Sequence, residues 1–263
     1  MKQVILYNEG IPEVLDIEEV SAYLRERLGK MPVKMVGNPF HFSSECHGYA
    51  ERLASLKIQD MRREITPEEI PPLQGEIEYE RKRIKGKTKA FGVLYDGFHL
   101  QKVFAQLIAG GGEVFEDSHI LLTNRLFATW DENDRRYHAR TGVYGFPSII
   151  STTGLVEAPA RQMEYYLLKQ QYELVGKDLL ELKGMFKGCF IDYEDERLTE
   201  VVKGYAMQAV FYSLTGNPFC DDRGCRLYNA HWQSELMFAQ LESGYEFCDT
   251  HNAALENLAG KYS

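Results

Sequence analysis

The sequence predicts a mixed α/β or α+β fold. Short apolar segments of strand length alternate with segments of helical spacing in the first half of the chain, and helical spacing dominates the second half. The chain has 263 residues, enough to bury a sizeable core, and its 44% hydrophobic and 26% charged content is that of a folded globular protein. The sequence contains no internal repeat or low-complexity segment, which argues against a repeat architecture.

The first half contains the predicted strands and three of the predicted helices. Strands are expected at residues 4–7, 33–36, 90–95, 119–123 and 145–151, each a short apolar run. Helices are expected at residues 17–28, 43–61 and 100–107. In the first helix, Val20 and Leu28 recur on one face. In the second, Ser43 or Ser44 provides the cap and Met61 lies on the inner side.

The second half is expected to consist mainly of helices. They are predicted at residues 157–175, 195–214 and 230–241, and in the first of them Met163, Leu167 and Leu174 recur at helical spacing. Three segments of the chain are predicted to be irregular. The segment 67–72 contains prolines, 76–87 runs from acidic to basic residues as in a solvated loop or strand edge, and 135–140 has the composition of a basic, solvated loop.

The composition indicates which cellular compartment and which kinds of partner to expect. The net charge is −9 with a pI near 5.4, so the chain as a whole repels phosphate backbones and we expect no nucleic acid partner. No apolar run reaches the length of a membrane span, and the N-terminal run is too short for a signal peptide. Five cysteines, three of them within 29 residues beside a histidine, favour metal binding in a reducing compartment. We expect a cytoplasmic protein.

Three cysteines and a histidine near the C-terminus have the spacing of zinc ligands. Cys220, Cys225, Cys248 and His251 form the pattern C-x4-C-x22-C-x2-H, with Gly224 where a tight chelating turn favours glycine. Zinc binds thiolates and imidazoles tetrahedrally, and two short ligand pairs are typical of its structural sites. Because all four ligands are protein groups, the predicted site is closed to water and serves structure, not catalysis. The sequence therefore predicts one structural zinc ion.

The same tail is similar to the end of the archaemetzincin signature. Archaemetzincins are zinc peptidase homologues with the pattern HExxHxxGxxHC-x4-C-x-M-x17-C-x2-C, in which the last four cysteines hold a structural zinc. Cys220, Cys225 and Cys248 match three of these cysteines, and His251 stands at the fourth. Leu227 takes the place of the methionine, and the segment between the ligand pairs is three residues longer. The chain thus resembles an archaemetzincin, a metzincin-related zinc metallopeptidase.

The catalytic half of that signature is not matched. Counted back from the first cysteine, the three metal-binding histidines fall on Ala209, Ser213 and Phe219, and the general-base glutamate falls on Val210. Gly216 alone is retained, at the position where the family's active-site helix ends. A catalytic zinc needs three donor side chains and an open position for water, and alanine and phenylalanine provide no donor. The resemblance therefore implies a degenerate member without catalytic residues.

The resemblance also implies an architecture and a role. We expect a metzincin-like mixed twisted sheet packed on helices over residues 1–215, with a degenerate active-site helix at about 195–215, followed by a helical, zinc-stapled subdomain at 216–263. The former substrate cleft is expected to bind a peptide or a partner protein along an edge strand, because strand addition needs no metal. This interpretation gives a non-catalytic binding protein with neither nucleic acid nor a membrane as partner.

An active zinc-dependent peptidase or hydrolase with a relocated centre is the alternative. Its candidate residues are the histidines outside the tail, namely His41, His47, His99, His119 and His138. His41, Cys46 and His47 form the densest cluster, but adjacent residues on a helix point about 100° apart, which opposes convergence. His231 is an alternative tail ligand, although its place beside Trp232 favours packing or the surface. The net charge opposes a third reading, a zinc-ribbon-like nucleic-acid module.

Overall fold

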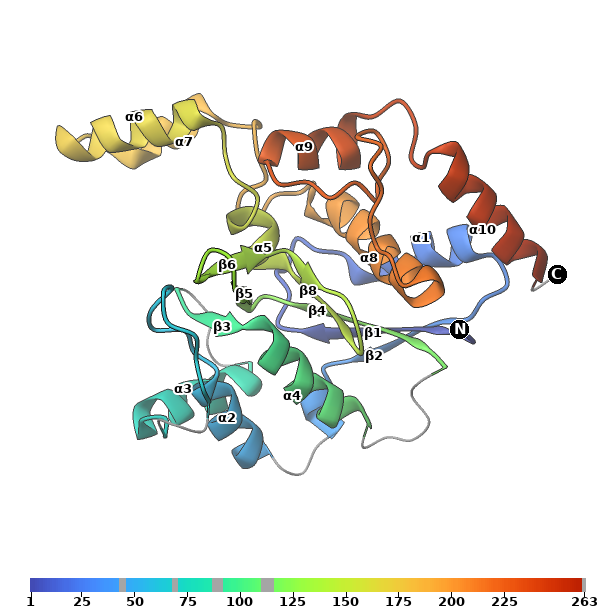
Figure 1. Ribbon diagram of the computed structural model, residues 1–263, viewed down its shortest axis with the longest axis horizontal. Helices are drawn as coiled ribbons and strands as arrows, with labels where there is room; N and C mark the ends of the chain where they lie inside the picture. The colour runs from blue at the N-terminus through green and yellow to red at the C-terminus, as the bar shows by residue number, and fades with distance from the viewer. Residues whose placement is uncertain (43–45, 68–70, 87–91, 110–115, 262–263) are drawn as a thin grey trace.

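The computed structural model describes residues 1–42, 46–67, 71–86, 92–109 and 116–261 (Figure 1). Its strands are β1 (Val4–Glu9), β2 (Val33–Gly37), β3 (Leu94–Asp96), β4 (Ser118–Thr123), β5 (Leu126–Asp131), β6 (Arg136–Arg140), β7 (Gly142–Val143) and β8 (Ser148–Ser151). Its helices are α1 (Ile17–Leu28), α2 (Cys46–Ser55), α3 (Gln74–Ile84), α4 (Gly97–Ala109), α5 (Thr152–Glu157), α6 (Met163–Leu174), α7 (Leu179–Met185), α8 (Leu198–Thr215), α9 (Gln233–Met237) and α10 (Asp249–Lys261). A 3₁₀ turn, η1 (Pro39–Phe42), and a π-helical turn, η2 (Phe238–Glu242), complete the elements.

The strands form two sheets. The larger sheet has the order β2-β1-β4-β8-β7, and the smaller one has the order β3-β5-β6. In the larger sheet β2, β1, β4 and β8 are parallel neighbours, whereas β7 runs antiparallel to β8 at the edge. Parallel strands covered on both faces are buried along their whole length, as every residue of β4 is, around its apolar run Ile120–Leu122. The predicted mixed α/β class is confirmed.

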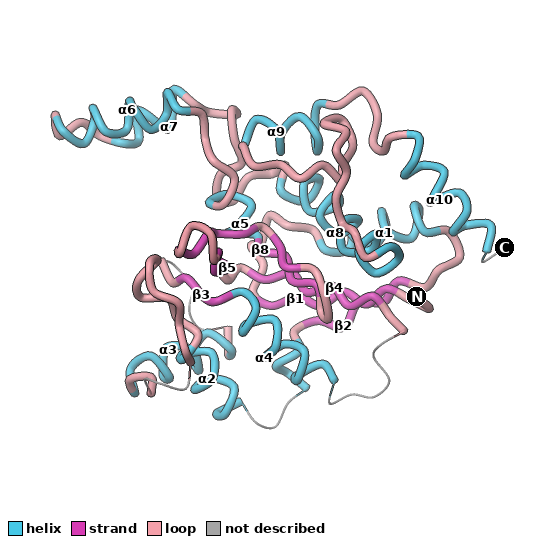
Figure 2. Tube along the Cα trace, viewed as in Figure 1, coloured by secondary structure: helices cyan, strands magenta, loops and turns pink. Residues whose placement is uncertain are grey.

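Helices cover both faces of the larger sheet (Figures 1 and 2). Because successive side chains of a strand point to opposite faces, Leu6 and Leu122 belong to one core, and Tyr7 and Leu121 belong to the other. The first core includes α1 and α8, and the second includes α2 and α4. Helix α8 lies in the middle of the first core and is buried at nearly every position from its start to Phe211.

Two helices have the end signals that the sequence contains. Asp16 caps α1, since its carboxylate accepts a hydrogen bond from the Glu19 backbone N–H at 3.0 Å. Helix α8 ends at Gly216, whose φ of +78° is left-handed and whose N–H donates to the Tyr212 carbonyl at 2.8 Å. The glycine expected to end the long helix therefore does so.

Two segments that were expected to be solvated and irregular are regular structure. The charged segment at 76–87 lies largely in α3, where Glu80 and Arg83 are buried. The basic segment at 135–140 forms β6, in which Tyr137 is fully buried and pairs with Trp130 of β5. Both predictions are wrong. Distant segments supply partners for Glu80 and Arg83 of α3, whereas 136–140 is a strand because its backbone pairs with β5, although Arg136 stays exposed.

The second predicted helix is shorter than expected. Helix α2 ends at Ser55, and Leu53 within it is buried. Met61 lies beyond the helix and is exposed. The predicted caps Ser43 and Ser44 lie outside the described residues. The predicted strand at 90–95 is described only from residue 92 and begins at Leu94 as β3.

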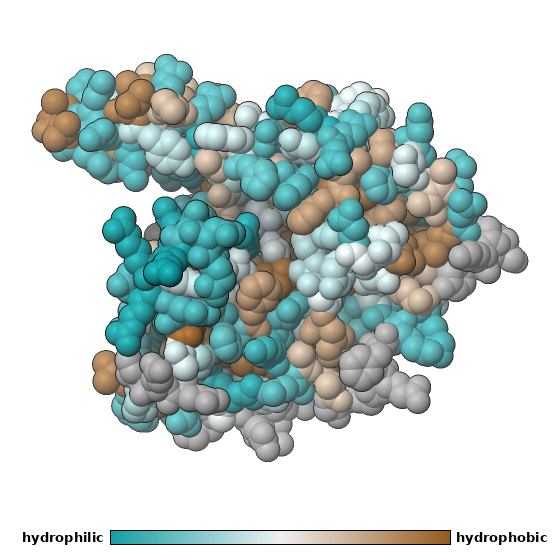
Figure 3. All heavy atoms as spheres, viewed as in Figure 1, coloured by the Kyte–Doolittle hydropathy of each residue, from teal (hydrophilic) through white to brown (hydrophobic). Residues whose placement is uncertain are grey.

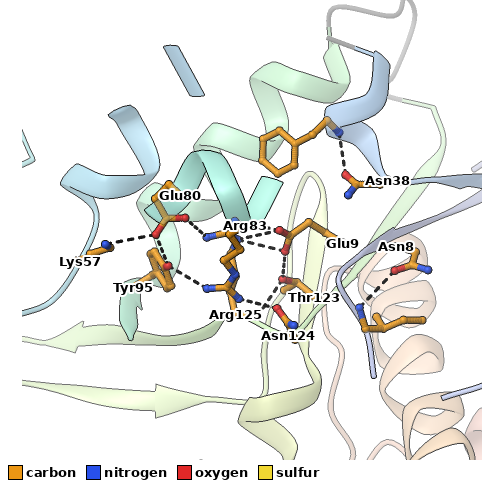
Figure 4. A network of polar contacts seen from close by, with 12 residues as sticks. Asn8, Glu9, Asn38, Lys57, Glu80, Arg83, Tyr95, Thr123, Asn124 and Arg125 are labelled. Carbon is orange, nitrogen blue, oxygen red and sulfur yellow. Dashed lines mark hydrogen bonds and ion pairs between the residues drawn. The ribbon is translucent and has the colours of Figure 1, made fainter. Parts of the chain in front are cut away.

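A buried network of charged side chains joins α3 to the sheets (Figure 4). Arg125 is fully buried and pairs with Glu9 of β1 at 3.0 Å and with Glu80 of α3 at 2.7 Å. Glu80 also accepts a hydrogen bond from the Tyr95 hydroxyl at 2.6 Å, and Arg83 donates to the same hydroxyl at 3.0 Å. Burial raises the pKa of Glu80, but the charge of Arg125 and the Tyr95 hydrogen bond hold that pKa below its usual range. Glu80 is therefore a buried carboxylate in its ionised form.

The second half of the chain ends in a tail that packs on the main core. Leu227, Phe247 and Leu255 belong to the same buried cluster as α1 and α8. The boundary between residues 215 and 216 stays a prediction. Helices α6 and α7 instead form a hairpin that projects from the body (Figure 1), and the predicted helical spacing of α6 places Met163 and Leu174 on an exposed side. None of the helices in the described ranges combines the length and the apolar content that crossing a bilayer requires.

Candidate metal centre and adjoining cavity

The four predicted zinc ligands come together in the tail. Cys220 and Cys225 flank the turn that follows α8, and Cys225 is fully buried. Cys248 directly precedes α10 and His251 lies in its first turn, where the His251 N–H donates to the Cys248 carbonyl at 3.0 Å. Residues three apart share a helix face, so this turn presents both side chains on one side. The donor atoms of all four residues lie within 4.8 Å of one another.

The spacing of these donors fits a tetrahedral zinc ion. With Zn–S near ~2.3 Å and Zn–N near ~2.0 Å, two sulfurs lie about 3.8 Å apart and a sulfur lies about 3.6 Å from a nitrogen. The Cys220 and Cys248 sulfurs are 3.8 Å apart, and the Cys225 sulfur is 3.7 Å from His251 Nδ1. The Cys248 sulfur is closer to that nitrogen, at 3.1 Å. The three cysteines are free thiols, so the Cys₃His group fits one zinc ion, as predicted.

Burial controls the protonation of the donors. It raises the pKa of the Cys225 thiol to about 12 and raises that of Cys220 as well, so without a cation both groups keep their protons. Burial lowers the pKa of His251, which favours the neutral imidazole that a metal requires. A bound zinc ion supplies the positive charge that stabilises buried thiolates, and its binding releases the thiol protons.

The turn between the first two cysteines is built around Tyr245. The Asp222 backbone N–H faces the Cys220 sulfur at 3.4 Å, and the Asp222 carboxylate accepts hydrogen bonds from the Gly224 N–H at 2.9 Å and the Tyr245 hydroxyl at 2.6 Å. A Cβ atom at Gly224 would lie 2.5 Å from that hydroxyl. Any larger residue here would displace the Tyr245 side chain from Asp222. Leu227, at the position of the family's methionine, is fully buried.

A cavity of about 410 Å³ opens beside the C-terminal end of α8. One wall is the segment 139–144, which runs from the end of β6 through β7 along the outer edges of both sheets. Another part of the lining is aromatic. The centre of the Tyr144 ring lies 6.2 Å from that of the Tyr212 ring and 5.6 Å from that of the Phe219 ring. Among the lining residues, Arg140 alone carries a formal charge and His231 alone carries an imidazole, and none carries a thiol or a carboxylate.

The positions aligned with the family's catalytic residues lie in different environments. Ala209 and Val210 are fully buried in the main core. The Ser213 hydroxyl donates to the Ala209 carbonyl at 3.0 Å and lies 2.8 Å from the Ser118 hydroxyl of β4. Phe219 is the one of the four that lines the cavity. These positions therefore do not converge on a common point in the cavity.

One other residue of α8 lines the cavity, and a second bonds to Tyr144 of its aromatic wall. Tyr212 lines the cavity. One turn earlier, the side-chain oxygen of Gln208 accepts a hydrogen bond from the Tyr144 hydroxyl, and the side-chain amide of Gln208 donates to the Tyr228 carbonyl at 3.2 Å. Residues four apart share a helix face. Sequence reasoning missed this pair because counting back from Cys220 selects the positions one residue later. A glutamine followed by a tyrosine has no recognisable spacing of its own.

The other histidines whose side chains the structure describes do not form a second centre. Three of them bond to separate partners: His99 to Asp96, His119 to Tyr7, and His138 to Asp134. His41 is exposed, and the side chains of Cys46 and His47 lie outside the described residues. Over the described part of the chain, the tail is the one place where three or more His, Cys, Asp or Glu donors converge. His231 is exposed at the cavity and does not belong to that group.

The chain matches a family model over most of its length and is similar to solved structures. The model of the Probable metallopeptidase family (DUF6775) matches residues 1–258. No curated protein matches the sequence. The chain is similar to the crystal structure of archaemetzincin from Methanopyrus kandleri, with 13% identity, a TM-score of 0.47, and coverage of 98% of this chain and 95% of that chain. It is also similar to the crystal structure of a zinc-dependent peptidase from Methanocorpusculum labreanum, with 15% identity, a TM-score of 0.44, and coverage of 96% of this chain and 99% of that chain.

Proposed function

Because this chain belongs to the probable metallopeptidase family whose model spans residues 1–258, we propose that it keeps one structural zinc ion but binds peptides or a partner protein without cleaving them. The zinc ion is held by Cys220, Cys225, Cys248 and His251, and the ligand occupies the cavity beside α8. A Cys₃His site uses all four tetrahedral positions for protein groups, so no position remains for a catalytic water.

The donor set of the cavity is the observation that carries the proposal. A catalytic zinc site needs three nitrogen, sulfur or carboxylate ligands around an open position, together with a base that activates the water. The lining residues provide His231 as their only imidazole and neither a thiol nor a carboxylate. The aligned residues Ala209 and Val210 contribute apolar side chains to the core. This set supports binding and lacks the groups for metal-assisted hydrolysis.

The sheet edge beside the cavity supports an extended peptide as the ligand. Strand β7 ends the larger sheet, so its outer backbone edge has no partner within that sheet. A peptide that adds as a strand along 139–144 can form hydrogen bonds with the backbone N–H and C=O groups of this edge and point alternate side chains into the cavity. Phe98, Tyr212 and Phe219 provide aromatic surface of the kind that anchors such ligands.

Among peptide ligands, Arg140 supports a preference for those that carry a carboxylate. It is the only formally charged residue in the lining of this cavity, in a chain whose net charge is −9. Its Nε donates to the Thr129 hydroxyl at 2.8 Å, which orients the guanidinium group. Guanidinium binds carboxylate through paired hydrogen bonds. We therefore expect peptides with an acidic side chain or a free C-terminus to bind best.

The proposal also includes the cytoplasm as the compartment. Zinc thiolate ligands must stay reduced, and an oxidising compartment favours disulfides instead. The exposed Cys189 adds a fourth free thiol among the described residues.

Peptide capture and hydrolysis, measured on one preparation, test this proposal. Protein purified without added metal is immobilised and incubated with a tryptic digest of casein, and retained peptides are identified by mass spectrometry. We expect retained peptides, no new cleavage products, and one zinc per chain by elemental analysis. Phe98→Ala, at a side chain 51% exposed on the cavity, should reduce retention about tenfold, as loss of a binding anchor does.

The matched control is Phe238→Ala, which removes a phenylalanine 43% exposed outside the cavity and should leave retention unchanged. Equal retention by the two variants would eliminate the cavity as the binding site. Chelator-sensitive cleavage of casein, or two zinc ions per chain, would contradict the non-catalytic proposal.

A further inference from the structure

The hairpin of α6 and α7 exposes more large apolar side chains than its own core buries. Its buried cluster consists of Tyr165, Leu182, Phe186 and Phe190. Eight others on the hairpin are 38–79% exposed, namely Met163, Tyr166, Leu167, Leu174, Val175, Leu179, Leu180 and Met185. Figure 3 shows apolar side chains gathered at the free end of this hairpin. A concentration of exposed apolar residues on one element is typical of an interaction surface.

The exposed residues of α6 form a stripe along one side of the helix. Met163, Leu167 and Leu174 are separated by four and seven residues, which places them on one face. A different side of α6 packs on α7 and the chain after it, as the Tyr165 ring does at 5.4 Å from that of Phe186. Helix α6 is therefore apolar on two sides, and within the described chain α7 covers only one of them. We call Met163, Tyr166, Leu167 and Leu174 the hairpin stripe.

Charge favours a second copy of the chain as the partner for this stripe. Residues 163–187 contain four acidic and four basic side chains, whereas the full chain has a net charge of −9. Two acidic chains repel each other overall, so their contact is least opposed where the surface is neutral. An anionic lipid surface instead attracts helices with a basic excess, which this hairpin lacks.

The exposed area matches what a stable dimer needs. The four side chains of the hairpin stripe expose on the order of 100 Å² each, which is about 400 Å² per chain, and with the other four exposed apolar residues the hairpin reaches the roughly 800 Å² that one partner contributes to a standard interface. A twofold axis allows the same stripe to serve on both sides of the contact, so a second copy supplies a surface of equal size and equal apolar character.

We propose that the α6–α7 hairpin is a dimerisation arm, on which the hairpin stripe of one chain packs against the hairpin stripe of a second copy. Leu167 and Leu174 lie within the contact. Because the core of a single hairpin is small, packing against a second hairpin stabilises both helices of the arm. This inference does not depend on what the cavity binds, because no hairpin residue lines it.

Light scattering coupled to size-exclusion chromatography tests the arm on the full zinc-loaded chain. From about 1 to 100 μM, the wild-type protein should move to a mass twice the chain mass of 30.3 kDa. The double variant Leu167→Glu/Leu174→Glu should weaken dimerisation at least about tenfold, because it places charges against an apolar contact. Glutamate is a good helix former, and circular dichroism should show an unchanged fold.

Leu73→Glu is the matched control, since Leu73 is 73% exposed and lies outside the hairpin, and it should dimerise like the wild type. A wild-type mass of one chain at every concentration overturns the proposal. So does a double variant that dimerises normally. Sedimentation of the monomer with vesicles of phosphatidylcholine and phosphatidylglycerol, abolished by the same double variant, would identify a membrane surface as the occupant instead.

Discussion

Arg125 is fully buried between two carboxylates, Glu9 of β1 and Glu80 of α3. A buried ion pair contributes little compared with an apolar pair of the same shape, because desolvation of the charges offsets their attraction. Removal of one partner is different, since it leaves a charge inside the protein without compensation. At the scale of single residues, loss of the Glu80 charge is therefore expected to destabilise the protein, because buried Arg125 would lose one of its two partners.

Glu80→Gln should lower the free energy of unfolding by about 3 kcal/mol at pH 7, measured by urea denaturation. The pKa of Glu80 is held below its usual range, so the stabilisation by its charge is complete above the unfolded pKa of about 4.3 and is lost as the pH falls through the folded pKa. The difference between wild type and variant should accordingly shrink below about pH 4.

Glu78→Gln is the control on the same helix, because Glu78 pairs with Arg81 at the surface and should cost less than about 1 kcal/mol. If the free energies of unfolding of wild type and Glu80→Gln differ by the same amount from pH 7 to pH 3, that result would argue against an ionised Glu80.

At the scale of elements, α5 and the wall of the cavity approach each other at a glycine. A Cβ atom at Gly154 would lie 2.4 Å from the carbonyl oxygen of Arg140, at the end of β6. Backbone cannot move aside as a flexible side chain can, so the close contact of helix and strand requires glycine. The position of the 139–144 wall thus depends on a residue outside the cavity.

Gly154→Ala should destabilise the protein by about 1–3 kcal/mol through overpacking, and it should also reduce peptide retention, because the wall shifts. The control is Gly184→Ala in α7, where an added Cβ meets no atom within 4 Å. That substitution should be neutral or stabilising by up to about 1 kcal/mol, since alanine favours helix. Similar urea midpoints for the two variants would refute the role assigned to the Gly154 contact.

At the scale of the whole molecule, the zinc tail is part of the main core. Cys225, Phe247 and Leu255 lie in the same buried cluster as α1 and α8, so loss of the metal affects residues far from it in the sequence. A tail that formed an independent module would instead unfold by itself and leave the rest intact.

Cys225→Ser should remove the zinc ion and lower the Tm in a single transition. A loss of about 4 kcal/mol corresponds to about 10 °C for a chain of this size. Chelation of the wild-type protein should have the same effect. Cys189→Ser, at an exposed thiol outside the Cys₃His group, should keep one zinc and an unchanged Tm. Two separate calorimetric transitions after chelation would show that the tail does not share the cooperativity of the core.

Apolar periodicity and short-range spacing made part of this protein predictable. Val20 and Leu28 defined α1, the apolar run of β4 defined a central strand, Gly216 marked the end of α8, and the cysteine spacing identified the Cys₃His group. Each of these signals lies within one element or one turn, where backbone geometry sets which residues share a face. The family resemblance rested on the same kind of local pattern.

Tertiary structure alone decided the rest. Glu80 and Arg83 are buried because Arg125 and Tyr95 come from other elements to pair with them, and no local pattern contains that information. The same holds for the cavity, whose walls come from β6, β7 and α8, and for α6, whose apolar spacing predicted a helix but not that one apolar side would be exposed. A sequence specifies which residues share a face of an element, whereas only the packed chain determines what that face meets.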